Sequence, residues 1–195
     1  YTAAPPWPDN DVWHKYTFGL EKSMVESWLS KITKDNMVIL NAGSGGTNYK
    51  IKGTIVHLDI IEAYIKTYQH YIVGSVEHID LPSQSIDGVI CVGSVLNYVD
   101  VQRAISEISR ILKPNGFFII EFERSNSAEF LFSKNHGKMI FSKEYSYNNQ
   151  SHLLWLYSEK HIKNILQTYH LSILKNRHIH TLSSLANRLG MSESK

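Results

Sequence analysis

The sequence contains one cysteine, five prolines, little net charge and no long apolar run. With Cys91 alone no internal disulfide can form, and its place in the apolar stretch 88–92 predicts a buried, inert thiol. No stretch reaches the roughly 18 consecutive apolar residues that a membrane span needs. The amino-terminal residues also lack the basic and apolar segments of a secretory signal. We therefore expect a cytoplasmic protein that has no membrane partner.

The formal net charge of +2 is too small to indicate a nucleic-acid partner. The 195 residues fit one domain, in which about 70% of the surface of the unfolded chain becomes buried. Because the sequence does not begin with Met, we expect a trimmed chain or a fragment.

Short apolar runs alternate with amphipathic segments along most of the chain. The runs at 38–40, 54–58, 71–74, 86–92 and 117–122 predict strands. The segments 19–32, 60–68, 101–112 and 159–169 predict helices, the last two capped by Asp100 and Ser158. Only about ten residues separate the first two strands after a glycine cluster, so a crossover helix there has little more than two turns. We expect an α/β fold, a doubly wound, mostly parallel, Rossmann-like sheet with helices on both faces.

Two of the predicted strands end on residues that suit a nucleoside-containing ligand. The first ends in the glycine cluster 43–46, and the second ends on the carboxylate of Asp59. In an open α/β sheet, ligands bind beyond the carboxyl ends of the strands. Glycine lets the backbone approach the ligand, and a carboxylate accepts hydrogen bonds from both ribose hydroxyls. Asp59 also suits the amino-terminal cap of the next helix, and one carboxylate can do both.

Two classes of cofactor fit this pattern. A dinucleotide fingerprint has a third glycine three places after the second, and Asn48 stands where that glycine is expected after Gly43 and Gly45. An NAD(P)-dependent oxidoreductase therefore stays the less favoured alternative.

The core of the chain resembles the class I S-adenosylmethionine-dependent methyltransferases, a family with the fold predicted above. The resemblance covers roughly residues 37–122 and consists of five signals in the family's order. These are 41–46, Asp59, 74–77 followed by 81–82 and 85–87, 91–98, and 108–116. The resemblance implies S-adenosylmethionine as the cofactor and in-line methyl transfer to an oxygen or nitrogen atom of a small-molecule acceptor.

The resemblance also implies a set of cofactor-binding residues at the strand ends. They are Asn41, Ala42, Gly43, Ser44, Gly45, Asp59, Ile60, Ser75, Val76, Glu77, Val92, Gly93 and Ser94. Asn41 and Ser75 stand where the family often has acidic residues. This departure keeps open a non-catalytic protein that binds S-adenosylmethionine or serves as a scaffold.

Methyl transfer needs a general base only where the acceptor must lose a proton. The catalytic candidates are His14 and Tyr16 before the first strand and Tyr98 after the fourth. Glu123, after the fifth strand, is a further candidate, and Asn97 suits the orientation of an acceptor.

The histidines are scattered, and His178 and His180 lack a nearby third ligand, so we expect no metal site. The aromatic segment 124–157 suits an acceptor pocket or a dimer contact, and we expect a monomer or a homodimer.

We expect one domain over residues 1–195. Its parts are an amino-terminal arm and cap helix (1–33), the cofactor-binding core (37–122), a hairpin or lid insertion (124–157) and a carboxyl-terminal part (158–195). In the last part, 171–180 predicts a strand and 182–189 a short helix.

Overall fold

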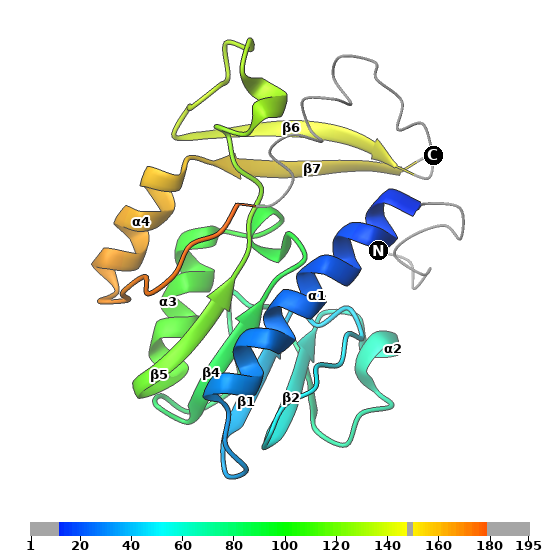
Figure 1. Cartoon of the computed structure of the whole chain (residues 1–195), viewed down its shortest axis with the longest axis vertical. Helices are drawn as coiled ribbons and strands as arrows, with labels where there is room; N and C mark the ends of the chain where they lie inside the picture. Colours follow the sequence, from blue (N-terminus) through cyan, green and yellow to red (C-terminus); the bar gives the residue numbers. More distant parts are fainter. Residues whose placement is uncertain (1–11, 148–149, 179–195) are drawn as a thin grey trace.

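Five parallel strands form the central sheet of the computed structural model, which describes residues 12–147 and 150–178 (Figure 1). The strand order is β3-β2-β1-β4-β5. The strands are β1 (Val38–Ala42), β2 (Thr54–Asp59), β3 (Tyr71–Val73), β4 (Ile86–Cys91) and β5 (Leu112–Ile120). The order reverses between β1 and β4, and such a switch point is where open α/β sheets bind ligands. The prediction of a doubly wound parallel sheet is confirmed.

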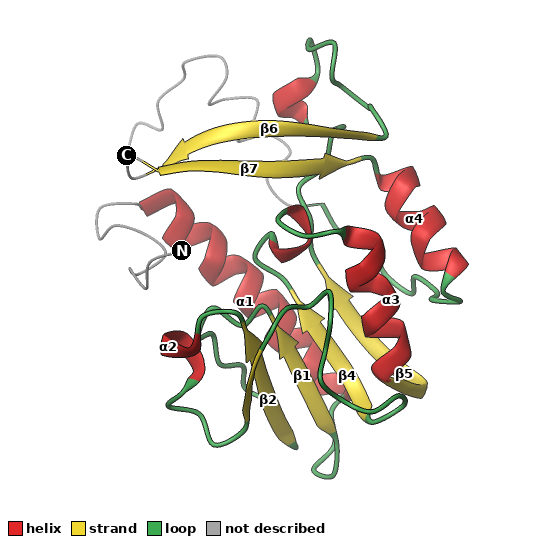
Figure 2. Cartoon of the chain, turned by 180° about the vertical axis from the view of Figure 1, so that it is seen from behind, coloured by secondary structure: helices red, strands yellow, loops and turns green. Residues whose placement is uncertain are grey.

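Helices cover both faces of this sheet. On one face, Val25 and Leu29 of α1 (Val12–Ile32) pack on Ile39, Ile90 and Ile119 of the sheet. The other face is covered by α3 (Val101–Ile111) and α4 (Glu159–Thr168) (Figure 2).

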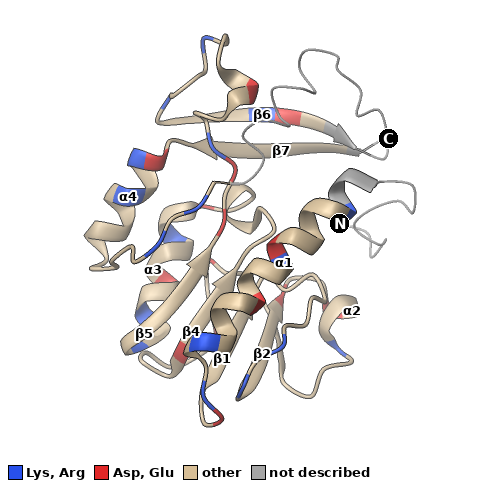
Figure 3. Cartoon of the chain, viewed as in Figure 1, with Lys and Arg blue, Asp and Glu red and all other residues tan. Residues whose placement is uncertain are grey.

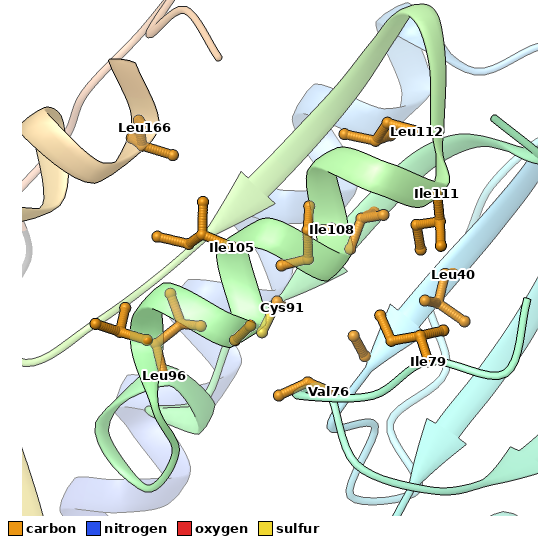
Figure 4. Packing of buried hydrophobic residues seen from close by; sticks show 14 of the residues in the cluster. Leu40, Val76, Ile79, Cys91, Leu96, Ile105, Ile108, Ile111, Leu112 and Leu166 are labelled. Carbon is orange, nitrogen blue, oxygen red and sulfur yellow. The ribbon is translucent and has the colours of Figure 1, made fainter. Parts of the chain in front are cut away.

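The packing of α3 follows from its sequence. Its apolar residues recur every three or four positions, so they share one face of the helix. Figure 4 shows Ile108 and Ile111 of this face beside Cys91 and Leu40 of the sheet. The Asp100 carboxylate accepts hydrogen bonds from the first turn of the helix, as a cap does. The predicted helix and its cap are confirmed.

The connection between β1 and β2 differs from the prediction, because residues 43–53 contain no helix. Four glycines in this stretch, Gly43, Gly45, Gly46 and Gly53, have positive φ, which a right-handed helix does not allow. Instead the stretch inserts Tyr49, 5% exposed, against Val25 and Leu29 of α1. The next helix, α2 (Glu62–Ile65), is also shorter than the predicted 60–68.

An antiparallel hairpin, β6 (Ile140–Tyr147) and β7 (Gln150–Tyr157), forms a separate two-stranded sheet. It lies beyond the carboxyl ends of the central strands (Figure 2). Phe130 of the short helix η2 (Ala128–Phe130) packs with Leu154 and Leu156 in a small core of its own. The hairpin expected in the segment 124–157 is therefore present.

Asn97 joins the hairpin to the central sheet. It ends the short helix η1 (Val95–Asn97) after β4 and is fully buried. Its Nδ2 donates to the carbonyl oxygens of Trp155 (2.6 Å) and Glu123 (3.2 Å), and its Oδ1 accepts from the Glu123 amide (2.8 Å). These bonds occupy the side chain, so the expected role in orienting an acceptor does not fit this geometry.

The predicted carboxyl-terminal strand is wrong in its described part. Residues 171–178 form no strand, and Leu174 is 95% exposed. The chain leaves α4 through His170, whose positive φ ends the helix, and pairs with no sheet in the part that the structure describes. Residues 179–180 and the predicted helix 182–189 lie outside the described residues, as does the arm 1–11. None of the described helices is both long and apolar enough to cross a bilayer.

We expect Asn97→Ala to lower the free energy of unfolding by about 2 kcal/mol, because it removes the three hydrogen bonds that this fully buried side chain makes to the backbone of Glu123 and Trp155. Urea denaturation of this variant, beside Asn48→Ala at an exposed position, measures the difference. Equal stability of the two variants would contradict the proposed attachment of the hairpin.

Candidate functional site

The glycine loop after β1 has a shape that only glycine permits. Gly43, Gly45 and Gly46 have φ values of +70°, +52° and +77°. A Cβ on Gly43 would overlap the side chain of Val95, whereas a Cβ on Gly45 would meet nothing within 4 Å. The amides of Gly43 and Ser44 both donate to the Leu58 carbonyl at 2.9 Å. The loop is thus hydrogen-bonded to β2 through Gly43 and Ser44, and the space next to the Gly45 backbone is open.

Asp59 holds the ends of β1 and β2 together. Its Oδ2 accepts from the Gly45 amide at 2.7 Å, and its Oδ1 accepts from the Ile61 amide at 2.9 Å. The residue is 8% exposed. A carboxylate has about four lone-pair sites, so these two bonds leave capacity for further donors such as ribose hydroxyls.

The side chains of Asn41 and Ser44 lie beneath the glycine loop, where both are buried. Asn41 Nδ2 donates to the Thr47 carbonyl at 2.7 Å and to Ser44 Oγ at 3.2 Å. Ser44 Oγ in turn lies 2.8 Å from Nδ1 of His57, a buried histidine of β2. Burial lowers the pKa of His57. These side chains therefore hold the loop from below.

In the turn after β3, the polar side chains form hydrogen bonds with neighbouring protein groups. Ser75 Oγ donates to the Glu77 carboxylate at 3.2 Å and accepts from the Glu77 amide at 3.1 Å. Glu77 also accepts from the Asp100 amide at 2.9 Å, and Val76 is part of the core. A hollow of about 350 Å³ lies on the α3 side of Glu77 and Asp100, away from the glycine loop. For a bound adenine, this turn offers backbone groups and apolar surface more than free side chains.

Two carboxylates that the sequence analysis did not single out meet the loop after β4. Gly93 and Ser94 have φ values of +83° and +60°, and nothing lies within 4 Å of a Cβ added to Gly93. The Ser94 amide donates to Glu121 at 2.6 Å, and the Gly93 amide is near enough to the carboxyl groups of Glu121 and of Glu21 in α1 to act against the rise in their pKa values. Figure 3 shows acidic positions in the middle of α1 and in the chain between β5 and the hairpin.

Both carboxyl groups have raised pKa values. Burial, followed by the charges of Glu21 and Glu123, raises the pKa of Glu121 to about 8. Burial and the Glu123 charge raise the pKa of Glu21, and its Oε1 is buried without a hydrogen-bond partner. These carboxyl groups therefore hold protons at a higher pH than exposed glutamates do.

The catalytic candidates from the sequence are spread over the structure. Tyr16 is 63% exposed on α1, and Tyr98 is 42% exposed with its ring edge-on to His152 of β7, 6.5 Å between centroids. His14 lies in the first turn of α1, outside the residues whose side chains the structure describes.

In the described part of the chain, no three His, Cys, Asp or Glu residues are placed to hold a metal ion. His178 instead lies 3.4 Å from Glu159, and His180 is outside the described residues.

Comparison with known proteins shows a likeness to methyltransferase domains over part of the chain. Residues 40–120 match the family model of a methyltransferase domain. The uncharacterized protein MJ1252 of Methanocaldococcus jannaschii is 32% identical over 112 residues, 54% of this chain and 43% of that protein. The match thus spans less than half the length of this relative.

Two solved structures resemble the whole described chain. A putative S-adenosylmethionine-dependent methyltransferase from Listeria monocytogenes has a TM-score of 0.67 and 11% identity, covering 88% of this chain and 93% of that one. The PH0226 protein of Pyrococcus horikoshii has a TM-score of 0.59 and 17% identity, with coverage of 85% and 86%. At these identities the likeness shows the fold alone.

We expect the stability of the wild type to fall between pH 5 and pH 8 more steeply than that of Glu121→Gln. The pKa of Glu121 is about 8 in the folded protein and ordinarily 4.5, so the folded state binds a proton that the unfolded chain has released. This contribution is complete below pH 4.5 and is lost as the pH rises through 8. Urea denaturation at both pH values measures it, with Glu62→Gln at an exposed position as the control. Identical pH profiles for wild type and Glu121→Gln would contradict the raised pKa.

Proposed function

We propose that this chain, whose residues 40–120 match the family model of a methyltransferase domain, is a class I S-adenosylmethionine-dependent methyltransferase that transfers a methyl group to an oxygen or nitrogen atom of a small-molecule acceptor. The observation that carries the proposal is the bond from the Gly45 amide to Asp59, which places an open glycine loop and a carboxylate at one edge of the sheet. The cofactor of this family, S-adenosylmethionine, presents a ribose and a flexible methionine chain to such an edge.

The residues present fit this cofactor. Asp59 has acceptor capacity left for the ribose hydroxyls, and Ile60 beside it is 58% exposed, as a contact to the nucleoside requires. The backbone at Gly45 and Gly93 is open, because no atom lies within 4 Å of an added Cβ at either glycine. The backbone at Gly45 and Gly93 would therefore hold the methionine part of the cofactor.

The cofactor supplies a methyl group already activated on sulfur, so this chain has to align the acceptor, exclude water and accept a proton. We assign the proton-accepting role to Glu121, with Glu21 beside it, in place of His14, Tyr16 and Tyr98. Glu121 lies at the end of β5 beside the Gly93–Ser94 amides, and a pKa of about 8 suits a base that works near neutral pH. The new bond from the acceptor to the methyl carbon forms as the carbon–sulfur bond breaks, and the acceptor's proton passes to the carboxylate.

The β6–β7 hairpin lies across the carboxyl edge of the sheet and would line the other side of an acceptor site there. Its strand β7 exposes Leu153 and Trp155 (53% and 42% exposed), and on the opposite face of the strand the ring of His152 lies edge-on to Tyr98. An acceptor with an apolar or aromatic part fits such a lining.

We expect Asp59→Ala to weaken binding of S-adenosylhomocysteine, the demethylated cofactor, by at least about tenfold, or 1.4 kcal/mol. Calorimetric titration measures this effect, with Asp80→Ala at an exposed position as the matched control. NADH serves as the control ligand and is expected not to bind. Binding of NADH in place of the adenosyl ligand, or binding indifferent to Asp59, contradicts the proposed site.

Turnover distinguishes an enzyme from a non-catalytic binding protein. The wild type is incubated with S-adenosylmethionine and a panel of small amines, phenols and carboxylic acids, and release of S-adenosylhomocysteine is measured. Tight cofactor binding with no release on any acceptor would favour the non-catalytic alternative.

A further inference from the structure

The cofactor loop has to keep one shape without the support of a helix. Residues 43–53 form an irregular connection in which Gly43, Gly45 and Gly46 have positive φ. Glycine-rich backbone has many accessible conformations, so a fixed shape needs other contacts. Those contacts come from four side chains beneath the loop, Asn41, Ser44, His57 and Tyr68, which we call the loop network.

The loop network contacts the first half of the loop at three residues. Asn41 Nδ2 donates to the Thr47 carbonyl (2.7 Å) and to Ser44 Oγ (3.2 Å). The Tyr68 hydroxyl donates to the Gly46 carbonyl at 2.6 Å.

His57 joins the Asn41–Ser44 pair to Tyr68. Its Nδ1 lies 2.8 Å from Ser44 Oγ, and its ring stacks on the Tyr68 ring with 3.7 Å between centroids and 11° between planes. The residue is 2% exposed. A change at His57 therefore affects the contacts to both Ser44 and Gly46.

The hydrogen bonds define the protonation state of His57 that suits the loop. Ser44 Oγ accepts from Asn41, and its own proton finds an acceptor in a bare Nδ1 of His57. A proton on Nδ1 would make Ser44 Oγ accept from both Asn41 and His57 and would leave the Ser44 proton with no acceptor among the described residues, and a proton on both ring nitrogens would bury a charge. We therefore assign the neutral tautomer with the proton on Nε2.

The groups around His57 do not compensate a positive charge. Tyr68 stacks on the ring, and Tyr71 and His70 belong to β3 and the turn before it, where the His70 carbonyl accepts the His57 amide. Asp59 is the carboxylate closest along β2, and it is bonded to the Gly45 and Ile61 amides. Burial lowers the pKa of His57 in this setting.

We propose that neutral His57 is a positioning residue that holds the glycine loop in its cofactor-binding shape, so that proton uptake by His57 and cofactor binding oppose each other. The proposal rests on the proposed function, because it concerns the same cofactor loop. By linkage, each event weakens the other by the same factor. Cofactor affinity then falls as the pH drops below the ordinary range of histidine, and bound cofactor keeps His57 neutral to a lower pH.

Two substitutions separate the hydrogen bond from the ring. His57→Asn keeps an acceptor near the position of Nδ1 but does not titrate. His57→Phe keeps the stacked ring but removes the acceptor. His70→Asn changes an exposed histidine of the same region and is the matched control.

Calorimetric titration with S-adenosylhomocysteine at pH 7.5, 6.5 and 5.5 tests the proposal. We expect the wild type and His70→Asn to lose about twofold or more in affinity between pH 7.5 and pH 5.5. Glu21 and Glu121 titrate in every variant, so the ratio of wild-type to His57→Asn affinity isolates His57; we expect this ratio to fall about twofold or more over the same range. His57→Phe should bind weakly at all three pH values, and thermal denaturation at each pH checks that every variant is folded.

A nitrogen-detected NMR titration of the His57 ring gives a second readout. It should show a bare Nδ1 at pH 7, and a lower pKa with S-adenosylhomocysteine than without it. A protonated Nδ1 at pH 7, or the same pH dependence in wild type and His57→Asn, would overturn the proposal and leave the proposed function intact. Failure of the wild type to bind the ligand at any pH would instead overturn the proposed function, and this proposal with it.

Discussion

The hydrogen bond from the Gly45 amide to the Asp59 carboxylate is the contact on which the rest of the site depends. It joins the loop after β1 to the end of β2 through two residues that are 14 positions apart in the sequence. The same carboxylate accepts from Ile61 and so begins the next connection. Without this contact, the glycine loop would keep only its bonds to Leu58 and to the side chains beneath it. One carboxylate thus shapes the protein part of the site and leaves lone pairs for a ligand.

The central fold could be predicted from the sequence because its signals are local. The five apolar runs and the period of α3 predict their elements from neighbouring residues, and Asp100 and Ser158 predict the starts of two helices. The connection 43–53 could not be predicted in the same way. Its glycines exclude a helix, but its shape depends on Tyr49 packing under α1 and on His57, which is remote in sequence. The apolar residues in 171–178 favoured a strand, but these residues form none, because no neighbouring strand pairs with them.

The strand-end residues of the candidate cofactor site can be recognised in the sequence, whereas the pairing of Glu121 with Glu21 cannot. Gly43, Gly45 and Asp59 are recognisable because each ends a strand in the manner of the fold. Glu121 also ends an apolar strand, so the signal that selected Asp59 was present there as well. The proximity of Glu121 to Glu21 could not be predicted from the sequence, because it depends on how α1 crosses the sheet (Figure 1). The raised pKa of Glu121 arises from that proximity and from burial.

The most direct test of the account maps a bound ligand onto the backbone. Amide chemical shifts of the isotope-labelled protein are recorded as S-adenosylhomocysteine is added. The account predicts the largest changes at Gly45, the Asp59–Ile61 turn and the Gly93–Ser94 loop, with smaller changes in the hairpin. Changes confined to another part of the chain, or none at saturating ligand, would contradict a cofactor site at these strand ends.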